Sequence, residues 1–269
     1  MRRSTKGVGA VNAGPLLGPE TVSWRVNREP VIFAGAGRAL LLQVAHPLVA
    51  AGVAEHSDYE QHPWQRLYRT LNISYKIAFA DPKTSEAAAR RLHGRHDHVT
   101  GTSSDGVHYS ALDPDLLTWV WATLVDTSLM VYERCFAPLS TADREVFYQE
   151  QKRFAMACGV PEGACPDRFG DFAAYVGRMV AYELRVTQPA LVTAQAITRP
   201  NPWVVRPLAL PHNLFTAGLL PPRVREQYGF PWSQSRQRLM DAAFASARVG
   251  VRVVPRRLRE VPVAMVGAA

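Results

Sequence analysis

The sequence predicts an all-α fold, a single-domain helical bundle with only short irregular or minor strand elements. Apolar residues recur at helical spacing along most of the 269 residues, strictly alternating stretches are few, and several apolar segments follow helix-start signals such as Asp-Pro. Since 47% of the residues are hydrophobic, the chain can bury a large core. No internal repeat or low-complexity linker marks a boundary. We therefore expect one domain over residues 31–269, preceded by a loosely ordered arm, rich in Gly and Pro, over residues 1–30.

The first predicted helix runs from Arg38 to about Glu55 and is apolar around most of its circumference. Such a helix is typically buried in the centre of a core. Pro47 lies inside this segment, where proline removes one backbone donor and clashes with the carbonyl group four residues earlier. The sequence therefore predicts a kink near Gln43 to Pro47.

The glycines just before this helix resemble the start of a dinucleotide-binding fingerprint, Gly35-Ala-Gly37. The third glycine position of that motif is Leu40, and no β-α-β alternation follows. These two departures argue against a nucleotide site.

A second helix is predicted from about Trp64 to Phe79, and one of its stripes carries Arg66, Arg69 and Thr70 in line with isoleucines. Arginine is costly to bury without a carboxylate, a phosphate or a similar anion. This stripe therefore predicts either an internal ion pair, with Glu60 or Asp81 as candidate partners, or the binding of an anionic group.

A third helix begins with Asp81-Pro82, a favourable N-cap and N1 pair, and runs to about Val99. It contains a histidine cluster, and imidazole is a ligand for Fe, Zn, Cu and Ni. His96 shares a stripe with Leu92, whereas His93 lies on the flank of that stripe and His98 points to another side. His96 is thus the favoured ligand candidate, and the alternative is a hydrogen-bonded core histidine.

The rest of the chain continues the helical pattern. The predicted segments are a strongly apolar helix from Asp113-Pro114 to before Pro138, a helix from Ser140 to Gly159, a helix from Phe169 to Leu184, short helices and loops over Pro189 to Pro222, and a last helix from Ser233 to Val249.

Composition excludes several classes of protein. The net charge of +8 comes from basic residues spread along the chain, and no nucleic-acid-binding module is present. We interpret the densest basic cluster, Arg252 to Arg259, as a solvated face in preference to a site for an anionic membrane or an acidic partner.

The three cysteines, Cys135, Cys158 and Cys165, predict reduced, mostly buried thiols. No run of about 18 apolar residues and no apolar signal core appear, so we expect a cytoplasmic protein without a transmembrane segment.

Several motifs, in order and spacing, are similar to those of one family. They are Leu41-Leu-Gln-Val-Ala-His46-Pro47 with Gly52-Val53 and His56-Ser57, Arg66-Leu-Tyr-Arg69-Thr70, His96-Asp-His-Val99-Thr-Gly101, Tyr109-Ser-Ala-Leu-Asp113-Pro114, and Trp119-Val-Trp-Ala-Thr123-Leu124. From about Val31 to Pro262 the chain resembles the MpaB-type oxygenase family, which includes the catalytic domain of the latex-clearing rubber oxygenases.

This resemblance implies an all-α fold around a buried haem b pocket, with one axial histidine and with dioxygen used to attack an unsaturated or otherwise unactivated hydrocarbon. The family pattern puts the iron ligand at His96, and it puts Arg66, Arg69 and Thr70 in the haem pocket. The arginines would neutralise a haem propionate or donate to dioxygen, and Thr70 would be a second donor. This chain has Trp121 where many relatives have histidine, so the substrate pocket is expected to differ there.

Three functions are therefore considered. The first is a haem b-dependent oxygenase that acts on a small, apolar or unsaturated organic substrate. The second is a non-haem metalloenzyme that binds its metal through His93, His96 or His56. The third is a non-catalytic helical protein that binds a lipid or isoprenoid. If no histidine of the cluster holds haem iron, His46 or His56 becomes the candidate ligand.

Overall fold

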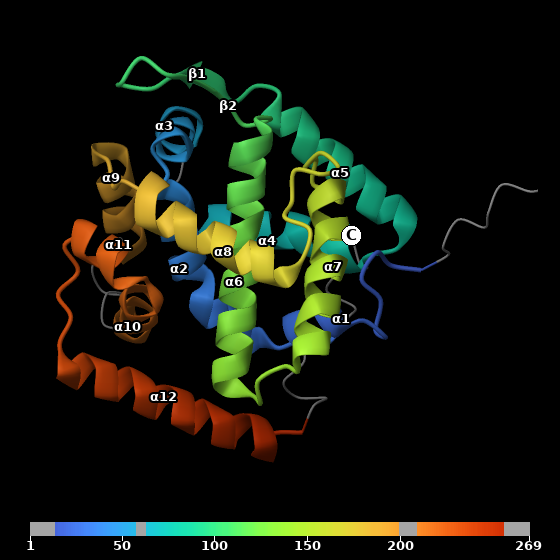
Figure 1. Ribbon diagram of the computed structural model, residues 1–269, viewed down its shortest axis with the longest axis vertical. Helices are drawn as coiled ribbons and strands as arrows, with labels where there is room; N and C mark the ends of the chain where they lie inside the picture. The colour runs from blue at the N-terminus through green and yellow to red at the C-terminus, as the bar shows by residue number, and fades with distance from the viewer. Residues whose placement is uncertain (1–13, 58–62, 199–208, 256–269) are drawn as a thin grey trace, which may run out of the picture.

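The computed structural model describes residues 14–57, 63–198 and 209–255, and within these ranges the all-α prediction is confirmed (Figure 1). The elements, with one 3-10 helix (η1) and one π-helix (η2), are α1 Val22–Asn27, η1 Pro30–Gly35, α2 Ala36–Val44, α3 Pro47–His56, α4 Pro63–Phe79, α5 Pro82–His96, β1 Thr100–Thr102, β2 His108–Ser110, α6 Pro114–Cys135, α7 Thr141–Ala157, α8 Phe169–Arg178, η2 Met179–Glu183, α9 Gln188–Thr198, α10 Ala209–Leu219, α11 Pro222–Gln227 and α12 Gln234–Val253.

Helix α6 runs through the middle of the bundle, with α7 beside it and α8 crossing it (Figure 1). Asp113 caps α6 by accepting hydrogen bonds from the backbone of Asp115 and Leu116, as the Asp-Pro signal predicted. The indole of Trp119 is fully buried and donates to the carbonyl oxygen of Leu42 over 3.1 Å. This bond joins the central helix to α2.

The chain breaks at Pro47, where the sequence predicted only a kink. Helix α2 ends at Val44, α3 begins at Pro47, and the η1–α2 segment meets α3 at a bend of 103°. Proline cannot donate to the carbonyl oxygen of Gln43, which accepts from the backbone N–H of His46. At the break, the Ala45 carbonyl oxygen accepts from the backbone N–H of Arg185. Two short helices thus replace the predicted long one. Among the described residues no single helix is long and apolar enough to cross a bilayer, although this bent pair has the combined length and composition.

Gly35 and Gly37 allow close helix packing, consistent with the argument against a nucleotide site. A Cβ atom at Gly35 would collide with the methyl group of Thr127 on α6, and one at Gly37 would collide with the hydroxyl group of Thr216 on α10. Only glycine permits such an approach of the backbone to neighbouring side chains.

The described part of the predicted N-terminal arm, residues 14–30, packs against the bundle. Leu17 and Val26 are buried in the core, and Thr21 caps α1 by accepting from the backbone N–H of Trp24. Two buried apolar side chains and a capped helix hold residues 14–30 against the bundle. Residues 1–13 lie outside the described ranges.

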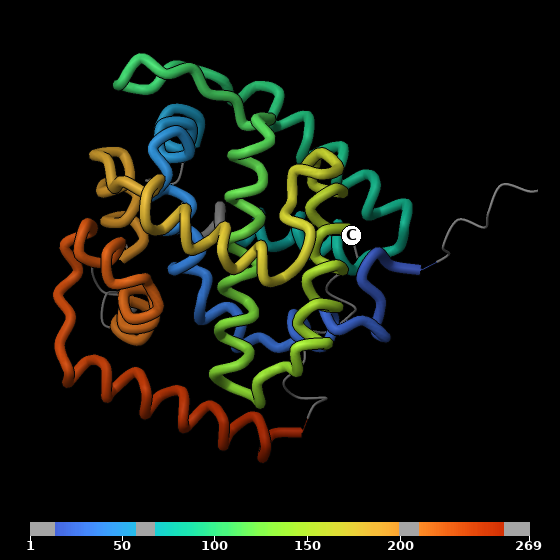
Figure 2. Tube along the Cα trace, in the orientation of Figure 1, coloured from blue at the N-terminus to red at the C-terminus, as the bar shows by residue number. Residues whose placement is uncertain are grey.

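The minor strand content is a single antiparallel hairpin, β1 with β2, in the described residues; Figure 2 shows its trace beyond α3. Gly101 pairs with Tyr109 across the hairpin, and a Cβ atom at Gly101 would lie 2.5 Å from the Tyr109 hydroxyl oxygen. That hydroxyl donates to Glu55 of α3. The hairpin is therefore fixed to the end of α3.

Candidate functional site

The candidate site is built on α4 and α5, two consecutive helices that are joined by a short turn and pack against each other as a helical hairpin. The turn between them is set by Asp81, whose carboxylate accepts from the backbone N–H groups of Lys83 and Thr84 over 3.0 and 3.1 Å. The Ser85 hydroxyl then donates to the carbonyl oxygen of Ile77 over 2.6 Å. This bond fixes the register of the two helices.

One stripe of α5 faces the protein. Ser85, Ala89, Leu92 and His96 are half-buried at helical spacing, and Ala88 beside them is buried. The intervening residues Glu86, Arg90, His93 and Arg95 are exposed. The helix phase predicted from the sequence is therefore the observed one, and it turns His96 inward.

His96 is the last residue of α5, and its Nδ1 atom is buried without a hydrogen-bond partner among the described residues. Burial lowers the pKa of its imidazole below the usual 6.5; the charge of His93 also lowers it, and Asp97 opposes the shift. His96 is therefore neutral near pH 7. A neutral imidazole is the form that binds metal ions.

The other two histidines of the cluster do not converge with His96. The His93 side chain is 57% exposed, and its Nε2 lies 3.7 Å from a carboxylate oxygen of Asp97. It lies on the side of α5 that faces Gly159, after the end of α7. His98 is exposed. In the parts of the chain that the structure describes, no group of three or more His, Cys, Asp or Glu residues is arranged to hold a metal ion.

The register of the hairpin relates the α4 stripe to α5. Position 66 lies eleven residues before Ile77, and His96 lies eleven residues after Ser85. Because both helices rise about 1.5 Å per residue, position 66 and His96 are about equally far from the turn along their helices, as are Thr70 and Leu92. The side chains of Arg69 and Thr70 are exposed, and the side chain of Arg66 is not among those that the structure describes.

The predicted ion-pair partners of these arginines are only partly described. Asp81 uses its carboxylate to cap α5, and Glu60 lies outside the described residues. Positions 66, 69 and 70 lie in the half of α4 away from the turn, as His96 does in α5, and Arg69 and Thr70 are exposed there.

His46 is a second buried histidine, which the sequence suggested only as a fallback ligand. It is the N-cap residue of α3, and its Nδ1 atom is also buried without a partner among the described residues. Burial lowers its pKa, against the opposing charges of Glu183, Asp113 and Asp115. The feature of the sequence that could have placed His46 at the start of a helix is the proline that follows it, because proline is favoured at the first helical position. His56, in contrast, places Nε2 3.1 Å from the Thr100 carbonyl oxygen at the hairpin.

Trp121 lies in the aromatic core. Its indole donates to the Gln151 carbonyl oxygen over 3.0 Å, and its ring contacts Tyr148 and Phe172. Its polar atom is therefore satisfied by α7. At this position the tryptophan packs α6 against α7 and α8.

The three cysteines are free thiols, as predicted, and none is poised to act as a thiolate ligand. Burial raises the pKa of Cys135 to about 11, that of Cys158 to about 12 and that of Cys165 to about 11. All three stay protonated near pH 7.

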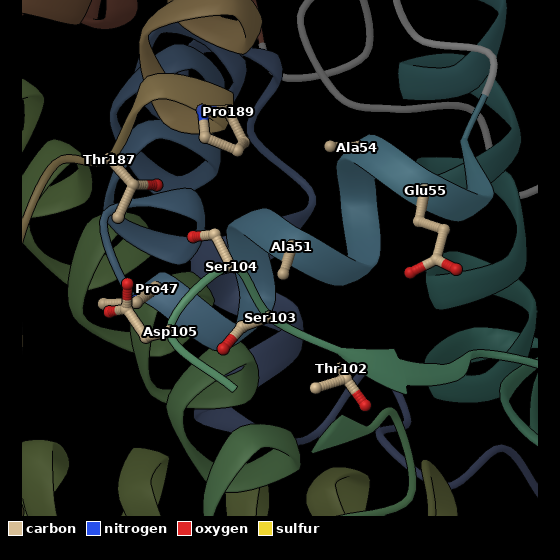
Figure 3. A pocket seen from close by; sticks show the side chains of 10 residues that line it. All are labelled: Pro47, Ala51, Ala54, Glu55, Thr102, Ser103, Ser104, Asp105, Thr187 and Pro189. Carbon is tan, nitrogen blue, oxygen red and sulfur yellow. The ribbon is translucent and has the colours of Figure 1, made fainter. Parts of the chain in front are cut away.

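A separate pocket of about 300 Å³ lies between α3, the β1–β2 hairpin and the start of α9 (Figure 3). Ala51 and Ala54 line one wall, and hydroxyl groups of the β1–β2 hairpin line the other. Glu55 joins this pocket to the Tyr109 contact described above. His96 and Thr70 are not among its lining residues.

The fold is an all-α core, and His96 on α5 has an Nδ1 atom without a hydrogen-bond partner among the described residues. The sequence profile of the family described as ER-bound oxygenase mpaB/B′/rubber oxygenase, catalytic domain, matches residues 24–252. This chain belongs to that family, whose members are oxygenases.

Two similar relatives come from mycobacteria. They are the uncharacterized protein Rv2237 of Mycobacterium tuberculosis and the uncharacterized protein Mb2261 of Mycobacterium bovis. Each is 30% identical to this chain over 226 residues, which cover 81% of this chain and 88% of the relative. No solved structure matches the chain.

Proposed function

We propose that this protein is a haem b-dependent oxygenase in which His96 is the axial ligand of the iron. The observation that carries this proposal is the buried Nδ1 atom of His96, which has no hydrogen-bond partner among the described residues. A buried polar atom without a partner is costly in a folded protein and needs an explanation. A cofactor held beside this ring would provide one.

The residues present fit a haem group. His96 supplies a neutral imidazole, because burial lowers its pKa. Ligation through one ring nitrogen leaves the other to hydrogen-bond a second group, which fixes the orientation of the ring. The arginine positions 66 and 69 offer the positive charge that haem propionates require.

The haem would supply the activation of dioxygen, and the protein would position the groups around it. Arg66 and Arg69 would bind the propionates or donate hydrogen bonds. Thr70 would provide one more hydroxyl donor on the same stripe of α4. The apolar side chains of the α5 stripe would exclude water from that side.

The proposed substrate class follows from the resemblance to the MpaB-type oxygenase family. We propose a small, apolar or unsaturated organic molecule that is oxidised or cleaved with dioxygen. Apolar residues such as Leu92, half-buried next to His96 along α5, support an apolar substrate over a charged one.

The absorption spectrum and metal content of the purified protein test this proposal. A Soret band with about one haem per chain is the expected result. Stoichiometric metal without a Soret band would favour the non-haem metalloenzyme. Protein that carries neither, even after incubation with haemin, would favour the non-catalytic binding protein.

A further inference from the structure

Helix α12 is attached to the bundle by one face. Met240 and Phe244 are buried, and the ring of Phe244 packs edge-on against Phe215 of α10 at 5.1 Å. The guanidinium of Arg134 on α6 lies 5.3 Å above the Phe244 ring. The helix therefore lies along one edge of the fold, across α6 and α10 (Figure 1).

The opposite face of α12 is apolar and open. Leu239 and Val249 are each 60% exposed, and Val253 is 74% exposed. Together with the exposed Ala242 and Ser246, they recur at alternating steps of three and four residues. That spacing puts all five on one continuous, uncharged stripe, which we call the α12 stripe.

Basic residues flank the α12 stripe on both sides. At helical spacing Arg238 and Arg252 lie along one side and Arg236 along the other, and all three are exposed. Asp241 is the single acidic residue in the sequence of α12, against four arginines. The sequence continues with three more arginines, at positions 256, 257 and 259.

We propose that the α12 stripe docks on the surface of a bilayer that contains anionic phospholipid. An amphipathic helix with arginines beside an apolar face lies in the plane of such a surface, with its apolar side chains in the acyl boundary. The arginine stems extend along the apolar surface and carry their charges to the lipid phosphates. This proposal is independent of the cofactor proposed for the α4–α5 hairpin.

A second copy of the chain fits the α12 stripe less well. In an antiparallel pair of stripes, Arg238 of one copy would face Arg252 of the other. In a parallel pair, Arg238 would face Ala243, which offers no negative charge. Anionic lipid offers negative charge to these arginines, whereas a second copy of the stripe does not.

Vesicle flotation of the full chain tests the proposal, with phosphatidylcholine vesicles and with vesicles that also contain phosphatidylglycerol. We expect binding to the anionic vesicles, and weaker binding in high salt. Val249→Asp should lower the bound fraction about tenfold, because it puts a carboxylate into the lipid boundary. Arg238→Gln combined with Arg252→Gln should lower the affinity to a similar extent.

Val146→Asp is the matched control, because Val146 is an exposed helical valine on α7. It should bind vesicles as the wild type does. Leu239→Asp repeats the test at an independent position of the stripe, and circular dichroism checks that each variant is folded. The proposal is overturned if the wild type does not bind anionic vesicles, or if folded Val249→Asp and Leu239→Asp bind as the wild type does. It is also overturned if light scattering shows a dimer that these variants convert to a monomer, since the stripe would then bind a second copy.

Discussion

Gly37 lies directly against Thr216, with no room for a side chain between the α2 backbone and the α10 hydroxyl group. The two residues are far apart in the sequence, and their contact joins the N-terminal and C-terminal halves of the bundle. Close helix packing therefore accounts for Gly37 in the Gly-Ala-Gly pattern, without a nucleotide site.

Gly37→Ala should therefore destabilise the protein. Thr216 is completely buried, so the new methyl group would displace a packed side chain, at a cost of about 2 kcal/mol in the free energy of unfolding. Urea denaturation measures this change. Gly177→Ala is the control, because a Cβ atom there meets open space inside α8, and alanine should leave stability unchanged or raise it. Equal effects of the two substitutions would contradict the packing role of Gly37.

The buried arginine of α2 depends on its partner on α6. Arg38 is 2% exposed, and its guanidinium lies 2.6 Å from the carboxylate of Asp126. Asp126→Ala leaves this charge buried without its carboxylate and should cost about 3 kcal/mol. Asp143→Ala breaks an ion pair with Arg25 that is far more exposed, and it should cost less than about 1 kcal/mol. Thermal denaturation of both variants measures the difference, and similar losses would argue against the account of the buried pair.

His46 should make the stability of the protein depend on acid pH. Its pKa is lowered from 6.5 by burial, so below pH 6.5 the unfolded chain binds more protons than the folded one. The stabilising contribution of the neutral ring is complete above pH 6.5 and is lost as the pH falls through the folded pKa. His46→Asn supplies an uncharged N-cap residue and should reduce the loss of stability between about pH 7.5 and about pH 5.5. Urea denaturation at the two pH values tests this, with the exposed His98→Asn as control; an unchanged slope for His46→Asn would refute it.

Thr70 is expected to donate a hydrogen bond beside the haem. Thr70→Val keeps the shape of the side chain but removes its hydroxyl, so the haem content should stay the same while the environment of a bound diatomic ligand loses a donor. The infrared C–O stretching frequency of the reduced, carbon monoxide-treated protein should rise. Thr102→Val, on β1, should leave that frequency unchanged. An unchanged frequency in Thr70→Val would remove Thr70 from the proposed pocket.

The sequence predicted those features that depend on local periodicity. The Asp81-Pro82 and Asp113-Pro114 signals began helices as expected, and the spacing of Leu92 and His96 gave the correct burial phase for α5. These predictions succeed because capping and amphipathic spacing are properties of neighbouring residues.

Features that depend on distant residues were not predicted. The break at Pro47 is stabilised in part by the backbone of Arg185, and the order of residues 14–30 comes from burial of Leu17 and Val26 in the core. The burial of the His46 Nδ1 atom, which has no hydrogen-bond partner in the described part of the chain, likewise depends on how the helices pack around it. None of these relationships leaves a periodic signal in the sequence.

The haem content of three histidine variants tests the central claim most directly. His96→Ala, His93→Ala and His98→Ala are purified in parallel, and the ratio of Soret absorbance to protein is measured, with circular dichroism to check the fold. If His96 is the axial ligand, His96→Ala should be folded and almost free of haem, because the protein–iron bond is lost, whereas the other two variants should retain wild-type haem. A wild-type Soret band in folded His96→Ala would contradict the assignment. Loss of the band in His46→Ala, purified in the same way, would then place the ligand at the start of α3.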